Sequence, residues 1–384
     1  MNNSHFRRIG LSLCLLLLLP LTGCMHAIRL KDRAIVQAVG IDWKDERYQL
    51  TFQYFVPEGS GGQTAFDASK LNNNIIRSSG STITEAVSQA GRDQGRQLFF
   101  GSNRIVVLGR EMAKRDIETP VWYFNTQQQV SPGIYLMVAQ KSAEEIVSAQ
   151  IARGIVPASA IEQAAERGRS SRFLHGGRLI DIVMQLQGDA AAADLPLISL
   201  SGEEEQPQIV ISGSALCREG KLIDTLSEEE VLGVLWITGW MEQGSMSFPL
   251  TEDTLCALKI LGSNASLRPF IDKNGQLTME IKISVHSAIQ ETVGASLPIS
   301  EALRLASQEQ EKEIRRLAMR AIEKTVTQNE ADILGLYKAL RKYEPEYYRA
   351  HRQQLPQLLQ NMHFDLKITC NIGRMGLEAG EEKR

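Results

Sequence analysis

The residue whose type and position most favour a covalent modification is a cysteine that follows an apolar run near the start of the chain. Arg7 and Arg8 precede an apolar run from Ile9 to Leu21, which exits through Thr22 and Gly23 to Cys24. A positive start, a short apolar core and a small-residue exit are typical of a secretory signal. The run is shorter than the ~20 residues of a spanning helix, so we expect a segment that is removed.

The sequence Leu21-Thr22-Gly23-Cys24 resembles the lipobox of bacterial lipoproteins. The resemblance implies a signal peptide over residues 1–23 and a covalent diacylglycerol on the Cys24 thiol. Each buried CH₂ contributes about 0.8 kcal/mol, so two acyl chains hold a protein stably where one binds reversibly. Cys24 would therefore be a membrane anchor. The alternative is ordinary secretion with a chance cysteine at the exit, which predicts no lipid.

The other groups of reactive residues lack the spacing that catalysis or ligand binding needs. The glycines of 59–62 lie in a polar loop with no following lysine and helix start, unlike a phosphate-binding loop. Ser212-Gly213-Ser214 lies within an expected strand and lacks the glycine spacing of a nucleophile elbow. The acidic pairs are consecutive and stand at helix starts or in an expected linker: Glu144-Glu145, Glu203–Glu205 and Glu228–Glu230. We therefore expect no catalytic, cofactor or metal site.

Cysteine and histidine usage is sparse beyond the signal region. The remaining cysteines are Cys217, Cys256 and Cys370, an odd number with no C-x-x-C pair. This argues against a disulfide framework and against a zinc site. We expect buried reduced thiols, with one bridge as the alternative. The scattered histidines, His175 among them, are interpreted as surface or core residues.

Composition indicates an ordinary globular protein. Without residues 1–23, which hold Arg7 and Arg8 and no acid, 361 residues with 40 basic and 45 acidic side chains remain. This balance does not suggest a nucleic-acid partner. With 43% hydrophobic and 23% charged residues, the chain is long enough for two or three domains.

The first half alternates between strand and helix patterns. We expect strands over 34–42, 48–55, 104–109 and 133–140, a helix from Thr82, and helical segments over 112–126, interrupted at Pro120, and over 142–187. The hairpin formed by the first two strands argues against a purely parallel sheet. We therefore expect a mixed α/β region over 24–187, with room for two subdomains.

Small residues, two prolines and an acidic run over 188–208 predict a linker.

Beyond the predicted linker, Ser227 and Glu230 form a capping box for a helix that buries Val231, Leu235 and Trp236. Asn274-Gly275 predicts a hairpin. Further helices are expected over 301–327, 331–343 and from Pro345, and a closing strand over 363–372. The sequence predicts an α+β fold with antiparallel or mixed sheets, a C-terminal domain over 209–376 and a charged tail over 377–384.

Taken together, these residues resemble the Ger(x)C family of spore germination lipoproteins. The similarity begins with Cys24 and "AIVQAVGID" (34–42) and continues in "GSTITEA" (80–86) and "LFFGSNRIVVLGREMA" (98–113). It extends through "GSALCREGKLIDTLSEEEVLGVLWITG" (213–239), "QNEADILGLYKALRKYEPEYYRA" (328–350) and "ITCNIGRMG" (368–376). Met25 and His26 stand where the family usually has tryptophan and aspartate.

The resemblance implies a non-enzymatic C subunit of a nutrient germinant receptor. It implies two integral-membrane partner subunits and a lipid anchor on the outer face of the spore's inner membrane. The sequence does not determine whether this chain itself contacts the germinant. One alternative is a free-standing solute-binding lipoprotein, although the two halves show no repeated pattern. The other is an extracytoplasmic hydrolase, which would need a nucleophile and base that the spacing does not reveal.

Overall fold

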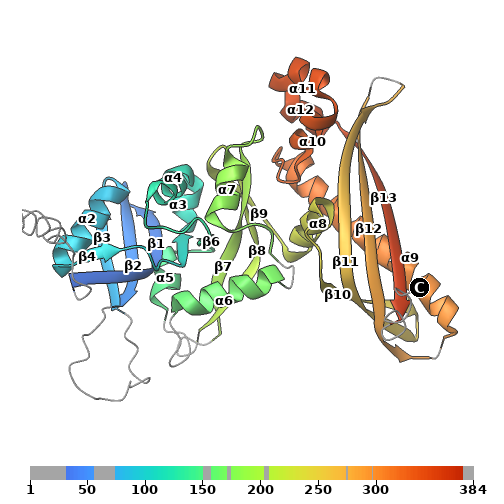
Figure 1. The fold of residues 1–384 in the computed structure, drawn as a ribbon, viewed down its shortest axis with the longest axis horizontal. Helices are drawn as coiled ribbons and strands as arrows, with labels where there is room; N and C mark the ends of the chain where they lie inside the picture. Colours follow the sequence, from blue (N-terminus) through green and yellow to red (C-terminus); the bar gives the residue numbers. More distant parts are fainter. Residues whose placement is uncertain are drawn as a thin grey trace, which may run out of the picture.

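The chain forms two sheet-based halves that lie side by side (Figure 1). The computed structural model describes residues 32–55, 74–149, 157–170, 174–202, 207–273, 276–295 and 297–374. The predicted signal peptide, Cys24, the Asn274-Gly275 turn and the tail at 377–384 lie outside the described residues.

The first half is built on a nine-stranded mixed sheet in the order β3-β2-β1-β5-β6-β7-β8-β9, with β4 also paired to β1. Strands β1, β5, β6 and β7 run parallel, whereas β2 and β3 at one end and β8 and β9 at the other pair antiparallel. The strands are β1 (Arg33–Lys44), β2 (Arg47–Phe55), β3 (Asn74–Gly80), β4 (Gln97–Phe99), β5 (Ile105–Leu108), β6 (Tyr135–Ala139), β7 (Ala192–Ser201), β8 (Gln208–Arg218) and β9 (Lys221–Leu226).

Helices cover both faces of this sheet (Figure 1). They are α2 (Ile83–Gln94), α3 (Arg110–Arg115), α4 (Glu118–Thr126) and α7 (Leu179–Leu186) on one face, and α5 (Ala143–Ser148) and α6 (Pro157–Ser170) on the other. Alternate residues of β5 enter the two cores, since Val106 and Leu108 pack toward the first set and Ile105 and Val107 toward the second. Burial on both faces explains why the central strands are continuous apolar runs.

Much of the predicted linker at 188–208 forms a strand in the structure. Strand β7 occupies 192–201 and pairs with both β6 and β8, and the first sheet continues to Leu226. Pro196 is tolerated because the pairing of β7 with β8 shifts register immediately after it, and an irregular position spares proline a ladder hydrogen bond. The passage between the halves therefore lies between β9 and the next helix.

The second half is a four-stranded sheet, in the order β10-β11-β12-β13, packed against a long helix. The first three strands are antiparallel, and β13 pairs parallel to β12. The elements are α8 (Glu228–Thr238), β10 (Gly244–Thr251), β11 (Thr254–Ile271), β12 (Leu277–Gly294), α9 (Ile299–Ile322), a π-helix η3 (Glu323–Gln328), α10 (Leu336–Tyr343), α11 (Pro345–His351), a 3₁₀ turn η4 (Arg352–Gln354), α12 (Leu355–Gln360) and β13 (His363–Arg374). These mixed sheets with packed helices confirm the α+β fold class.

Helix α8 joins the halves and has the predicted capping box. The Ser227 side chain accepts from the Glu230 amide, and the Glu230 carboxylate accepts from the Ser227 amide at 2.7 Å. Gly233 lies where α8 meets α9: a Cβ there would stand 2.1 Å from the Leu317 carbonyl oxygen. Glycine is therefore needed for the close approach of these helices.

Two predicted helix boundaries lie elsewhere in the structure: one interruption and one helix start. The interruption expected at Pro120 falls at Asp116 and Ile117, and Pro120 lies in the first turn of α4, where proline is tolerated. The helix expected from 331 begins at Leu336, because Asp332 turns the chain before it.

Candidate functional site

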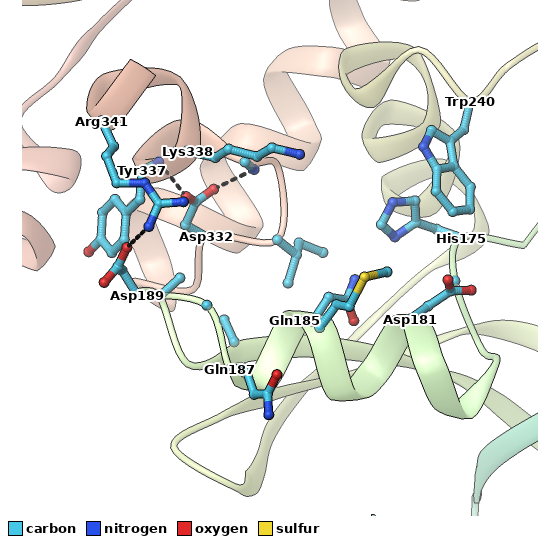
Figure 2. Close-up of a pocket in the computed structure, with 17 residues that line it drawn as sticks. His175, Asp181, Gln185, Gln187, Asp189, Trp240, Asp332, Tyr337, Lys338 and Arg341 are labelled. Carbon is cyan, nitrogen blue, oxygen red and sulfur yellow. Dashed lines mark hydrogen bonds and ion pairs between the residues drawn. The ribbon is translucent and has the colours of Figure 1, made fainter. Parts of the chain in front are cut away.

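A cleft of about 530 Å³ lies between the two halves (Figure 2). Helix α7 and the segments beside it form one wall, whereas the end of α8 and the segment from Asp332 through α10 supply the rest. Residues separated by more than 150 positions thus face one space, as His175 and Arg341 do.

The wall from the first half is organised by a buried histidine–aspartate pair. His175 Nδ1 lies 2.8 Å from Asp194 Oδ1, and the two residues are only 4% and 0% exposed. Gln185 on α7 donates its side-chain amide to the same Asp194 oxygen at 3.1 Å. A buried carboxylate is costly unless it is hydrogen-bonded, so these contacts fix the strand, the helix and the imidazole relative to one another.

The imidazole of His175 also connects this wall to the second half. Its ring centroid lies 5.0 Å from that of Trp240, which follows the left-handed Gly239 at the end of α8. Figure 2 shows the two rings facing each other at one end of the cleft. Aromatic pairs at this separation stabilise the packing beyond area burial alone.

The wall from the second half is shaped by Asp332. Its buried carboxylate accepts four backbone amides, those of residues 334–337, at 2.7 to 3.1 Å. Burial raises the pKa of this carboxyl, and the four amide donors oppose the rise. The carboxylate satisfies the first amides of α10 and so positions Lys338 and Arg341 on that helix.

Ion pairs close the cleft at its other end. Asp189, just after α7, accepts from Arg341 and from Arg352 at 3.0 Å each. Arg218 on β8 donates to the Asn329 carbonyl at 2.8 Å and to Glu330 at 3.1 Å. Both sets of contacts connect the first half of the molecule to the second half.

Asp224 on β9 makes a further joint, with Lys324 and with the Asn329 amide. Burial opposes its ionisation, but the bonds from Lys324, Thr225 and Asn329 outweigh that effect and hold its pKa below the ordinary value.

The cleft does not assemble a recognisable catalytic set. An aspartate that contacts Nδ1 orients an imidazole as in a catalytic triad, but a triad also needs a serine, threonine or cysteine against the ring. The described residues that line the cleft include no serine, threonine or cysteine. Within the described part of the chain, no three histidine, cysteine or acidic side chains gather as metal ligands.

The residues weighed in the sequence are scattered rather than brought together. Glu144 pairs with Arg77, Glu230 completes the capping box, and Ser212 and Ser214 lie in β8. Glu203–Glu205 and Cys24 lie outside the described residues. None of the described helices is both long enough and apolar enough to cross a bilayer.

The three late cysteines are free and buried, as expected. Burial raises the pKa of the Cys217 thiol, and raises that of Cys370 to about 12. The thiol of Cys256 shifts in the same direction for the same reason.

Sequence reasoning missed the role of His175 and Asp194. They lie 19 positions apart, with α7 between them, so no local spacing signals their pairing. The glycines at 176 and 177, both with positive φ, were the available signal, because they mark a tight turn beside the histidine.

Comparison with known proteins gives one consistent result. Residues 26–200 match the family described as "Spore germination protein N-terminal domain", and residues 212–376 match "Spore germination B3/ GerAC like, C-terminal". The chain is 23% identical over 396 residues to spore germination protein KC of Bacillus subtilis (strain 168), and the alignment covers 95% of each protein. The crystal structure of the GerBC protein superposes with a TM-score of 0.57 at 17% identity, over 87% of this chain and 96% of that one, so the fold is shared.

Proposed function

Because this chain belongs to the Ger(x)C family of spore germination proteins, we propose that it acts as a lipid-anchored C subunit of a nutrient germinant receptor. The observation that carries the proposal is the match to both family domains, in order, from residue 26 to residue 376. The relative KC is likewise named for spore germination and is similar along nearly its whole length.

The position of Cys24 supports anchoring on the outer face of the membrane. The family match begins at residue 26, two residues after Cys24, as expected if cleavage leaves that cysteine at the start of the mature chain. Its diacylglycerol would then hold the first half of the protein near the bilayer surface.

The role we propose is assembly with two integral-membrane subunits rather than catalysis. A buried histidine–aspartate pair holds the wall from the first half, and ion pairs join that wall to the second half. The described lining of the cleft includes no serine, threonine or cysteine. Its polar groups are arranged to fix the two halves relative to each other, which suits a rigid component of a complex.

Purification of the tagged chain from spore membranes in mild detergent tests the proposal. Mass spectrometry should find a diacylated Cys24 at the N-terminus and two integral-membrane companions. Cys24→Ala should abolish lipid attachment and weaken membrane retention. A lipidated chain that purifies alone would point to a solute-binding lipoprotein instead, and unchanged lipid labelling of the variant would refute the anchor.

A further inference from the structure

A second hollow continues from the cleft along the second half of the molecule. This basic groove, of about 460 Å³, runs between α10 and the middle of β11. It shares six lining residues with the cleft: His175, Gln185, Trp240, Ile333, Gly335 and Lys338. The two hollows therefore meet along one border, so an extended ligand has room to pass from one into the other.

The floor of the basic groove is apolar and belongs to the core. Ile237 and Leu334 are 1% and 3% exposed, and Leu267 from β11 packs against the same cluster. Trp240 and Tyr343 stand at the sides, and Tyr343 is 43% exposed. Apolar floors with aromatic sides are typical of surfaces that receive the apolar face of a peptide or helix.

The rim of the basic groove is positively charged. Lys338 and Lys342 are exposed on α10, and Lys342 Nζ lies 4.8 Å from the Tyr343 ring centroid. The Arg268 guanidinium approaches the same ring from β11 at 5.8 Å. Within the described part of the chain, none of these three cations forms an ion pair, and the described lining of the groove contains no aspartate or glutamate.

This local charge contrasts with the chain as a whole, whose net charge is −3. Uncompensated cations over an apolar floor complement a ligand that carries carboxylates beside apolar side chains, and complementary charge selects partners and their orientation. The joined length of cleft and groove favours an extended segment over a compact small molecule.

We propose that the basic groove docks an acidic, amphipathic segment of a partner subunit. The proposal rests on the function proposed above, because the partner is taken to be a subunit of the same receptor. Apolar side chains of the segment would pack on Leu267 and Trp240, and its carboxylates would pair with Lys338 and Lys342.

Site-specific photo-crosslinking in the assembled receptor tests this surface. Benzoylphenylalanine replaces Tyr343 in the full-length chain, and a control chain carries it at Lys312, a residue on α9 that is 77% exposed and lies outside the groove. After illumination, the crosslinked peptide is identified by mass spectrometry. We expect the probe at 343, and not the one at 312, to capture an acidic segment of a receptor subunit.

A charge reversal sharpens the test. The double change Lys338→Glu and Lys342→Glu should reduce the yield of the adduct at 343 about tenfold, since two attractive contacts become repulsive, whereas Lys312→Glu should leave it unchanged. Thermal melts of the purified variants confirm that each is folded.

The outcomes separate the two proposals. If receptor subunits co-purify but the probe at 343 captures lipid, a second copy of this chain, a basic segment or nothing, the docking proposal is wrong and the proposed function stands. If no subunit co-purifies with the unaltered chain, the proposed function fails, and the docking proposal falls with it.

Discussion

Asp332 replaces, with one side chain, the hydrogen bonds that the first turn of a helix cannot make for itself. Helix starts leave amides without intrahelical partners. Here one buried carboxylate accepts the first two amides of α10, those of Leu336 and Tyr337, and two more from the turn before it, those of Leu334 and Gly335. The four donors offset part of the cost of burying this charge.

Asp332→Asn should lower the free energy of unfolding by about 1–3 kcal/mol, because the new amide nitrogen cannot accept from a backbone amide that stays buried. Urea denaturation measures the change. Asp365→Asn serves as the control and should shift the midpoint little, because the Asp365 side chain is 42% exposed and makes one ion pair, at 3.6 Å. Equal midpoints for Asp332→Asn and wild type would contradict the capping role.

Residue-level features were predictable where their partners are near in sequence. The capping box of Ser227 and Glu230 spans three residues, so its pattern is visible in the sequence. The pair of His175 and Asp194 depends on how α7 folds back on β7, and the ion pair of Asp189 with Arg341 depends on how the two halves meet. Such contacts are set by tertiary structure, so sequence patterns did not reveal them.

At the scale of elements, the close crossing of α8 and α9 depends on a glycine, Gly233, at the point of contact. The nearest atoms to a Cβ at Gly233 would be the Leu317 carbonyl oxygen at 2.1 Å and the Ala321 Cβ at 2.7 Å. The Leu317 carbonyl oxygen belongs to the backbone and cannot rotate away as the end of a flexible side chain can. A side chain at position 233 would therefore force the helices apart.

Gly233→Ala should therefore destabilise the protein by about 1–3 kcal/mol through overpacking, even though alanine favours helix formation. Thermal unfolding followed by circular dichroism measures this. Gly262→Ala provides the matched control, since nothing lies within 4 Å of a Cβ there. A gain in stability for Gly233→Ala would show that the two helices separate at little cost.

The type of most elements could be predicted from periodicity, whereas the pairing of distant strands into sheets could not. The strands at 34–42 and 48–55 and the long helix near 301–327 are close to those observed. The range 188–208 was misread because Ala192, Ala193 and Pro196 resemble linker residues. They are in fact part of a buried strand, and only pairing partners distant in the sequence reveal it.

At the scale of the whole molecule, the two halves share one core. Ala192, Leu216 and Leu226 of the first sheet belong to the same apolar cluster as the residues of α8, α9 and the second sheet. Polar joints such as Asp224–Lys324 surround it.

Acid should weaken the contacts of Asp224 with Lys324 and Asn329, because protonation removes the negative charge of Asp224. The folded pKa of Asp224 lies below its ordinary value of 3.8, so its stabilisation is present above that pH and is lost as the pH falls through the folded pKa. Because the side chain is 34% exposed, the effect should be only about 0.5–1 kcal/mol.

Urea midpoints at pH 6 and pH 3 for wild type and Asp224→Asn measure this. The variant should lose less stability on acidification than wild type. Asp93→Asn, an exposed residue of α2, should behave as wild type does. A variant as acid-sensitive as wild type would show that Asp224 is not a stabilising joint.

The buried thiols give the molecule internal reporters of its own opening. Cys217 lies in the first sheet, whereas Cys256 and Cys370 lie in the second. Each is shielded and held in the protonated form, so an alkylating reagent can reach it only when the surrounding sheet transiently opens. Alkylation rates measured for each cysteine-containing peptide under native conditions would therefore show whether the two halves open together as one cooperative unit or open independently. No added label is needed.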